Sequence, residues 1–136
     1  MKDSLTLAAR LGLSTLFIIA GFAKIGAYAG TQQYMEAMGV PGALLPLVIA
    51  LELGGGLALL FGGFTRWIAA GLAVFSVASG VLFHFNPTDP NEMTQLFKNL
   101  AIAGGFVMLV AHGPGALSLD AWLARRRHAL PVGTPA

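Results

Sequence analysis

The sequence predicts an all-α integral membrane protein. We expect a bundle of four transmembrane helices, a short interfacial helix on the outer side and an amphipathic surface helix near the C-terminus. The 136 residues include only eight basic and six acidic side chains, or 10% charged residues, where a soluble domain has about 25%. Hydrophobic residues make up 56% and the mean hydropathy is +0.74. A small soluble domain needs far more polar side chains to cover its surface, so this class is excluded.

Four stretches of roughly 20 mainly apolar residues are long enough to cross a bilayer. The first covers about residues 8–27. Lys2 and Arg10 beside an apolar run are typical of a signal peptide, but three further apolar spans follow, and we interpret the run as a retained helix. The remaining spans are about 43–63, 67–85 and 95–112. Residues 1–128 are thus expected to form one membrane domain, with a disordered tail at 129–136.

The connections are short and carry signals for helix ends. Residues 28–41 contain the expected interfacial helix, with Thr31 as its N-cap. The connection at 86–94 contains the turn signals Asn-Pro and Asp-Pro. After the fourth span, Gly-Pro-Gly at 113–115 ends the helix. Ser118 is then expected to cap the amphipathic helix at 119–127, which we place on the membrane surface.

The basic residues predict the orientation. Four spans place both termini on one side of the membrane, and six basic residues fall on that side: Lys2, Arg10, Arg66, Arg125, Arg126 and Arg127. The other side has only Lys24 and Lys98. Because Lys and Arg are enriched on the cytoplasmic side, we expect both termini in the cytoplasm. The connections 28–41 and 86–94 then face outward.

Small residues recur at a spacing that lets membrane helices approach closely. Gly54, Ala58 and Gly62 lie four residues apart, and Gly55 and Gly63 flank them. The pattern predicts a compact bundle. A homo-oligomer interface is the alternative interpretation.

Glu52 is the one acidic side chain expected deep in the membrane. It lies about nine residues into the second span, so roughly 13–14 Å below the outer boundary at 1.5 Å per residue. An unpaired acid at that depth costs at least ~2.5 kcal/mol. Three glycines follow it, and they would let another helix or a flat ligand come close.

Candidate partners of Glu52 lie at the outer ends of the other three spans. They are Lys24, His84, Lys98 and Asn99. In a structural interpretation, the lysines reach toward the interface and Glu52 forms one buried pair. In a functional interpretation, these residues line a pocket that binds a polar headgroup or moves a proton, which is the usual role of ionisable groups within a membrane.

The sequence argues against several other sites. The chain has no cysteine, which excludes disulfides and thiolate-bound zinc or iron–sulfur clusters. No metal site is predicted, and a haem between His84 and His112 is disfavoured because the two histidines lie at opposite ends of their spans. The basic residues near the C-terminus most simply contact anionic lipid, so no nucleic-acid partner is expected. Asp120 is expected to pair with Arg10 or Arg66 and so dock the terminal helix.

The order of these groups resembles the DoxX family of small four-helix membrane proteins, over about residues 10–120. The resemblance depends on the following segments: Arg10, Ala-Gly-Phe-Ala-Lys at 20–24, Glu52 before a glycine-rich stretch and Arg66, Phe-Lys-Asn-Leu at 97–100, Gly-Pro-Gly at 113–115 and Ser-Leu-Asp at 118–120. It implies a multi-pass protein of the cell inner membrane. It also implies, by analogy with a thiosulfate:quinone oxidoreductase, a quinone ligand and partner oxidoreductase subunits.

Three hypotheses for function follow. In the first, the chain is a quinone- or lipid-binding membrane subunit of an oxidoreductase system. Glu52 would then accept a proton and His84 relay it, while Lys24, Lys98 and Asn99 would bind the headgroup. In the second, the chain is a membrane scaffold or assembly subunit without chemistry. The choice between the first two hypotheses leaves open whether the chain is an enzyme. The third, a small transporter, is disfavoured because no two spans are broken by Gly or Pro at corresponding positions.

Overall fold

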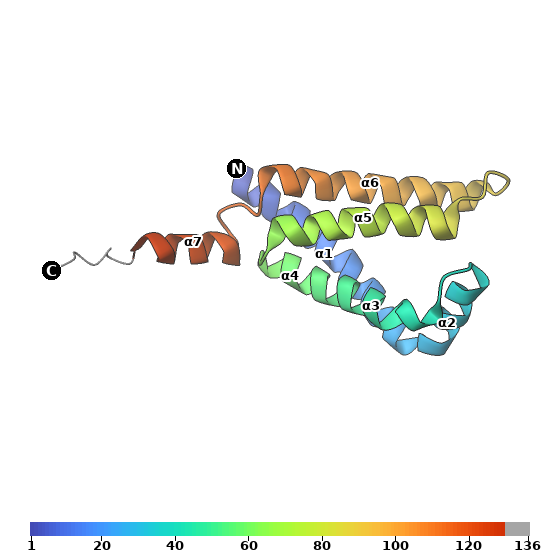
Figure 1. Ribbon diagram of the computed structural model, residues 1–136. Helices are drawn as coiled ribbons and strands as arrows, with labels where there is room; N and C mark the ends of the chain where they lie inside the picture. The colour runs from blue at the N-terminus through green and yellow to red at the C-terminus, as the bar shows by residue number, and fades with distance from the viewer. Residues whose placement is uncertain (130–136) are drawn as a thin grey trace.

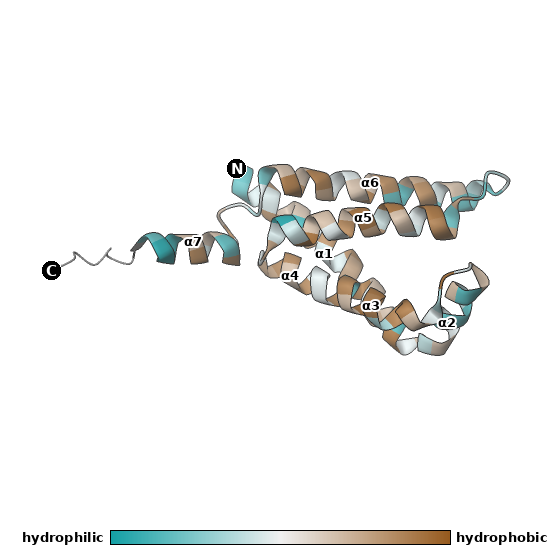
Figure 2. Ribbon diagram, in the orientation of Figure 1, coloured by the Kyte–Doolittle hydropathy of each residue, from teal (hydrophilic) through white to brown (hydrophobic). Residues whose placement is uncertain are grey.

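The computed structural model describes residues 1–129, and no β-strand occurs among them. Four helical stretches are long and apolar enough to cross a membrane: Lys2–Gly26, Gly42–Phe61, Thr65–His84 and Pro90–His112. Hydrophobic residues predominate along these helices, and polar residues gather at their ends and in the connections (Figure 2). The predicted all-α, four-span fold class is confirmed. Of the tail that the sequence predicts as disordered, 129–136, Ala129 is instead the last residue of a helix, and residues 130–136 lie outside the described residues.

The first span extends further than hydropathy alone suggests. Helix α1 (Lys2–Gly26) begins near the N-terminus, with Asp3 in its first turn, where an acidic side chain is favourable. Helix α2 (Tyr28–Ala37) follows almost directly and is the predicted interfacial helix. Its expected N-cap was wrong: the Thr31 hydroxyl lies inside α2 and donates to the carbonyl oxygen of Ala27, 2.8 Å away.

The second span consists of four consecutive helical segments. These are η1 (Gly42–Leu44), α3 (Leu45–Ile49), η2 (Ala50–Gly54) and α4 (Gly55–Phe61). The segment η2 is a turn of π-helix. Such turns insert an extra residue into a helix, and they occur frequently at functional sites. Glu52 lies in the middle of this turn.

Helices α5 (Thr65–His84) and α6 (Pro90–His112) form a hairpin and lie side by side (Figure 1). Helix α6 begins at Pro90 rather than near residue 95. The side chain of Asp89 accepts hydrogen bonds from the backbone N–H groups of Asn91 and Glu92, a typical N-cap, and proline is favoured at the first helical position. Hydropathy cannot detect this polar first turn.

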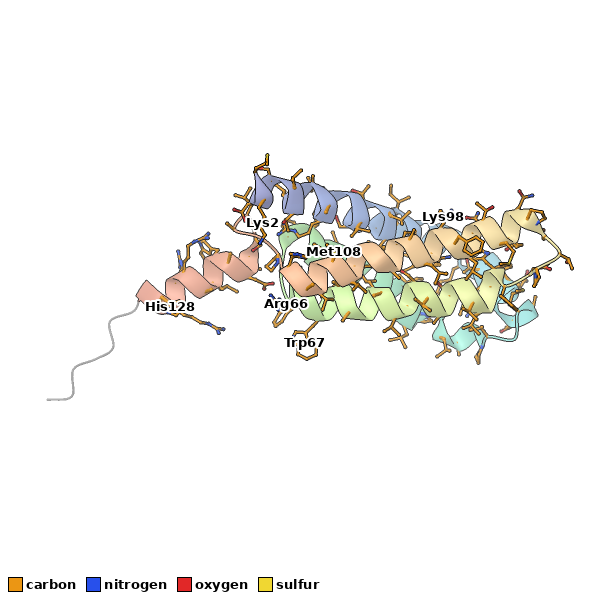
Figure 3. All side chains as sticks on the ribbon, turned by 90° about the horizontal axis from the view of Figure 1, so that it is seen from above. Lys2, Arg66, Trp67, Lys98, Met108 and His128 are labelled. Atoms are coloured by element: carbon orange, nitrogen blue, oxygen red, sulfur yellow. The ribbon has the colours of Figure 1, made fainter. Side chains whose placement is uncertain are left out.

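Helix α7 (Leu119–Ala129) follows the Gly-Pro-Gly break, and Gly113 and Gly115 there have φ values of +76° and +77°. The hydroxyl of Ser118 accepts from the N–H of Ala121, as its predicted cap role requires. In Figure 1, α7 starts at the bundle end that carries the N-terminus and extends away from it. The two ends of the bundle also differ in the predicted way: Lys2 and Arg66 lie toward the α7 end, while Lys98 lies toward the other (Figure 3).

The hydrophobic core lies between α1 and α4 on one side and the α5–α6 hairpin on the other. Phe17 of α1 packs against Phe106 of α6 with ring centroids 5.3 Å apart, and Leu59 and Leu72 are fully buried beside them. Helix α1 also contacts η2 and α4. The close approach of α1 to the second span depends on Gly21 and Gly56. Gly54, which the sequence pattern predicted at a helix contact, has open space around it.

Replacing Gly21 with alanine should lower the free energy of unfolding by about 1–3 kcal/mol, the usual range for overpacking. An added Cβ would lie 2.8 Å from the backbone nitrogen of Leu53, so α1 would have to move. Gly54→Ala is the matched control, because no atom lies within 4 Å of its added Cβ and alanine favours helix. Unfolding in SDS, followed by circular dichroism, compares the two. Equal stability of both variants would show that the α1–η2 contact is not tight.

Candidate functional site

The centre of the site is an ion pair between α1 and η2. The Nζ atom of Lys24 lies 2.8 Å from Oε2 of Glu52 and 3.1 Å from Oε1. Only the contact to Oε1 has hydrogen-bond geometry. The contact to Oε2 is ionic, and this buried oxygen has no hydrogen-bond partner among residues 1–129. Of the two lysines that the sequence offers as partners, Lys24 is the one that meets Glu52.

The two members of the pair differ in exposure. Glu52 is 4% exposed, whereas 28% of the Lys24 side chain is exposed. Glu52 is held from two sides: it lies in the π-helical turn, and Gly21 of α1 lets the neighbouring Leu53 backbone come close. The fold therefore keeps a carboxylate in the protein interior and gives it one cation.

A cavity of about 400 Å³ lies beside this pair. Lys24, Glu52, His84 and Asn99 all line it, so it gathers four of the five predicted site residues. Most of the remaining wall is apolar, and it comes from α2, the second span and α5: Met35, Val40, Leu44, Val48, Phe75, Ala78, Leu82 and Phe83. Ligand pockets measure roughly 300–1,000 Å³ and combine apolar walls with a few polar groups. This cavity therefore has the size and character of a ligand site. We call it the larger cavity, because a smaller one also has Glu52 in its wall.

A second, smaller cavity of about 250 Å³ also has Glu52 in its wall, and its other lining residues come from α1, α5 and α6. Its wall includes Gln95, Lys98 and Asn99 of α6. Lys98 is exposed and makes no ion pair with Glu52 in the described structure. Its place is therefore in the wall of this smaller cavity rather than beside the carboxylate.

His84 lines both cavities, and its partner is Glu92 rather than Glu52. The Nδ1 atom of His84 lies 2.6 Å from Oε2 of Glu92, in the first turn of α6. Sequence reasoning missed Glu92 because it placed this residue in the connection. The N-cap signal at Asp89, followed by Pro90, would have moved Glu92 onto the helix and opposite the end of α5.

Tyr34 is a second residue that sequence reasoning missed. Its ring stacks on Phe83 of α5 with centroids 5.5 Å apart, and both residues line the larger cavity. Through this contact α2 covers the outer end of the cavity. The single signal in the sequence is an aromatic residue on the polar interfacial helix, a common place for tyrosine at a membrane boundary.

No group of three or more His, Asp and Glu side chains that could hold a metal ion occurs in the part of the chain that the structure describes. The charged groups of this site are instead arranged as pairs, Lys24 with Glu52 and His84 with Glu92. They offer hydrogen-bond donors and acceptors to an organic headgroup.

Comparison with known proteins identifies the family. The DoxX family model matches residues 5–85. The chain belongs to the DoxX family. It is 52% identical over 126 residues to the inner membrane protein YqjF of Escherichia coli, covering 93% of this chain and 97% of that protein. It is 36% identical over 127 residues to the inner membrane protein YphA of the same organism, covering 88% and 90%. No solved structure matches the chain.

The part of this DoxX protein that matches the family model includes Lys24, Glu52 and His84, but it ends before Glu92 and α6. The matches to the two Escherichia coli relatives cover 93% and 88% of this chain and therefore extend into α6. The family match and the four apolar helices are two separate observations, and both indicate a membrane protein.

The opposite end of the DoxX bundle contains a buried cation. Arg10 of α1 is 1% exposed. Its Nη1 donates to the carbonyl oxygen of Pro114 at 2.8 Å, and its Nη2 donates to that of Leu60 at 3.2 Å. Gly62, with φ +74°, passes so close that an added Cβ would lie 2.5 Å from Nη1 of Arg10. Arg10 therefore ties α1 to the α4–α5 turn and to the segment before α7.

Asp120 docks α7, but not through an arginine as expected. Its two carboxylate oxygens accept hydrogen bonds from the backbone N–H groups of Phe64 and Thr65, at 2.8 and 2.9 Å. Within residues 1–129 it forms no ion pair. These N–H groups belong to the start of α5, where the helix leaves its first donors unpaired and an anion is favourable. The end of a helix, rather than a side chain, is the partner of Asp120.

Proposed function

We propose that this DoxX protein binds the headgroup of a membrane-soluble quinone-class molecule in the larger cavity, as a membrane subunit of an oxidoreductase system. The proposed location is the cell inner membrane, where the names of the two relatives place them, with both termini in the cytoplasm. The partner oxidoreductase subunits follow from the family resemblance and belong to the same proposal.

One observation carries the proposal: a buried ion pair forms part of the wall of a mainly apolar cavity. A flat aromatic head with polar substituents fits this combination, because the ring can lie against Phe75 and Leu82 while an oxygen reaches Lys24. A long apolar tail can leave toward lipid, since Leu44 and Leu82 are exposed at the cavity rim. A small polar metabolite would leave these apolar walls without a partner.

The residues of the chain would bind and orient such a head. Lys24 is the donor for one oxygen, and Glu52 is the acceptor for a proton. His84 lines the cavity and is held by Glu92, so it is placed to pass a proton toward the outer end of the bundle. A bound quinone supplies the two-electron chemistry. Electrons would come from a partner protein, because the chain has no cysteine to hold an iron–sulfur cluster.

Filling the cavity should abolish most of the binding. Ala78 lines the larger cavity, is exposed and makes no polar contact, so we expect Ala78→Phe to weaken binding of ubiquinone-1 or its quinol by about tenfold or more. Ala101→Phe is the matched control, since Ala101 is equally exposed but lines neither cavity. Equilibrium dialysis of the protein in lipid nanodiscs measures both.

If wild-type protein binds neither redox form, the proposal fails, and the scaffold hypothesis takes its place. The scaffold hypothesis predicts that Ala78→Phe leaves the recruitment of partner proteins unchanged. Binding that Ala78→Phe and Ala101→Phe weaken equally would place the ligand elsewhere in the bundle and would also overturn the proposal.

A further inference from the structure

The Lys24–Glu52 pair has unused hydrogen-bonding capacity of two kinds. A carboxylate accepts at about four lone-pair positions, and an ammonium group donates three hydrogens. In the described structure Glu52 has one hydrogen-bond donor, Lys24, and its Oε2 has none. A ligand beside the pair therefore meets a carboxylate with unused acceptor positions and a cation that can still donate.

The other polar side chains of the larger cavity differ in what they keep for a ligand. Thr31 Oγ1 donates its hydrogen to Ala27, and Ser79 Oγ donates its hydrogen to Ser76, so these two hydroxyls keep oxygen lone pairs. Asn99 Nδ2 donates to the carbonyl oxygen of Gln95, which leaves one amide hydrogen and the lone pairs of Oδ1. Tyr34 also lines the cavity, and its hydroxyl can both donate and accept. These side chains offer both donors and acceptors, so selection between ligands depends on the Lys24–Glu52 pair.

We propose that this cavity selects a hydroxyl-bearing head, such as a quinol or another phenol, over the corresponding quinone. This inference rests on the proposed function and specifies its ligand. A hydroxyl group accepts from Lys24 and donates to Glu52 at the same time. A quinone carbonyl accepts only: it satisfies the lysine, offers the carboxylate no hydrogen beyond those of Lys24 and sets two oxygens with lone pairs against each other. A buried acceptor left without a donor is unfavourable.

The test compares two redox forms of one molecule. Ubiquinone-1 and its quinol share ring and tail and differ in the two oxygens. We expect wild-type protein in nanodiscs, dialysed under argon, to bind the quinol at least about tenfold more tightly. Glu52→Gln should reduce this preference to about threefold or less, because an amide both donates and accepts. Glu36→Gln, which removes an exposed carboxylate that lines neither cavity, should keep the full preference.

The outcomes separate the inference from the proposed function. No binding of either form by wild type overturns both. Equal binding of the two forms overturns the inference alone, as does a preference that survives in Glu52→Gln. Should Glu52→Gln fail to fold, the dimethyl ether of the quinol tests the same point on wild-type protein. It keeps the oxygens and loses the donors, so it should bind at least about tenfold more weakly than the quinol; equal affinity would refute the selection.

Discussion

Lys24→Met should lower the free energy of unfolding by about 3 kcal/mol. Removing one member of a buried ion pair costs about 3–5 kcal/mol, because the remaining charge stays in the interior without a partner. We expect the lower end of this range, since 28% of the Lys24 side chain is exposed and part of its stabilising effect is already weakened by solvent. Glu52, at 4% exposure, is the charge left behind. Unfolding in mixtures of SDS and dodecyl maltoside gives the measurement.

The double variant Lys24→Met, Glu52→Gln provides the decisive control. It removes both charges, so it should recover most of the lost stability, and the double-mutant cycle should give a coupling of the same sign and similar size. Lys98→Met removes an exposed lysine that makes no ion pair among residues 1–129, and it should change stability by about 0.5 kcal/mol or less. A Lys24→Met protein as stable as wild type would mean that the pair does not stabilise the carboxylate.

The fold was predictable because its main signal is additive along the chain. Each span needs only a long apolar run, and single residues matter little to that sum. The ends of the spans depend on individual polar contacts. Helix α6 begins at Pro90 because Asp89 caps it, and Thr31 was assigned a cap role that its position within α2 excludes. Hydropathy predicts which residues lie in the bilayer, but it does not predict the residue at which a helix begins or ends.

The pairing of Lys24 with Glu52 was predictable for a similar reason. A buried acid needs a cation, and alternating helix directions leave only two lysines at the right end. The rest of the site depends on relations between helices that no local pattern encodes. The larger cavity exists because α2 reaches back to α5 through the Tyr34–Phe83 stack. The partner of His84 was missed because Glu92 comes close only once α6 starts early.

Arg10 shows the same limit at the other end of the bundle. Sequence reasoning used it chiefly as a cytoplasmic charge and as a candidate partner for Asp120. The structure instead buries it and directs its guanidinium to two backbone carbonyl oxygens. A planar guanidinium presents its donors in a rigid fork and can reach two separate carbonyl oxygens from two nitrogens, whereas a lysine has to bind both from a single nitrogen. Gly62 has to be a glycine for the guanidinium to fit there.

Arg10→Met should therefore lower the free energy of unfolding by about 3 kcal/mol or more, since each hydrogen bond from a charged group is worth about 1.5–3 kcal/mol. Arg10→Lys should recover only part of the loss. Arg66→Met is the matched control: Arg66 is exposed at the same end of the bundle (Figure 3), and its loss should change stability by about 0.5 kcal/mol or less. SDS unfolding ranks the three variants.

The same substitution should also loosen α7, because Arg10 holds the Pro114 carbonyl in the segment that leads to it. The expected sign is faster amide hydrogen exchange at Phe64 and Thr65, whose N–H groups are protected by the Asp120 carboxylate. Asp120→Asn should speed exchange at these two amides while leaving the four-span bundle stable, since it removes only the anion at the start of α5. If Arg10→Met unfolds more easily yet leaves these amides protected, Arg10 stabilises the α1–α4 contact alone, and α7 docks independently of it.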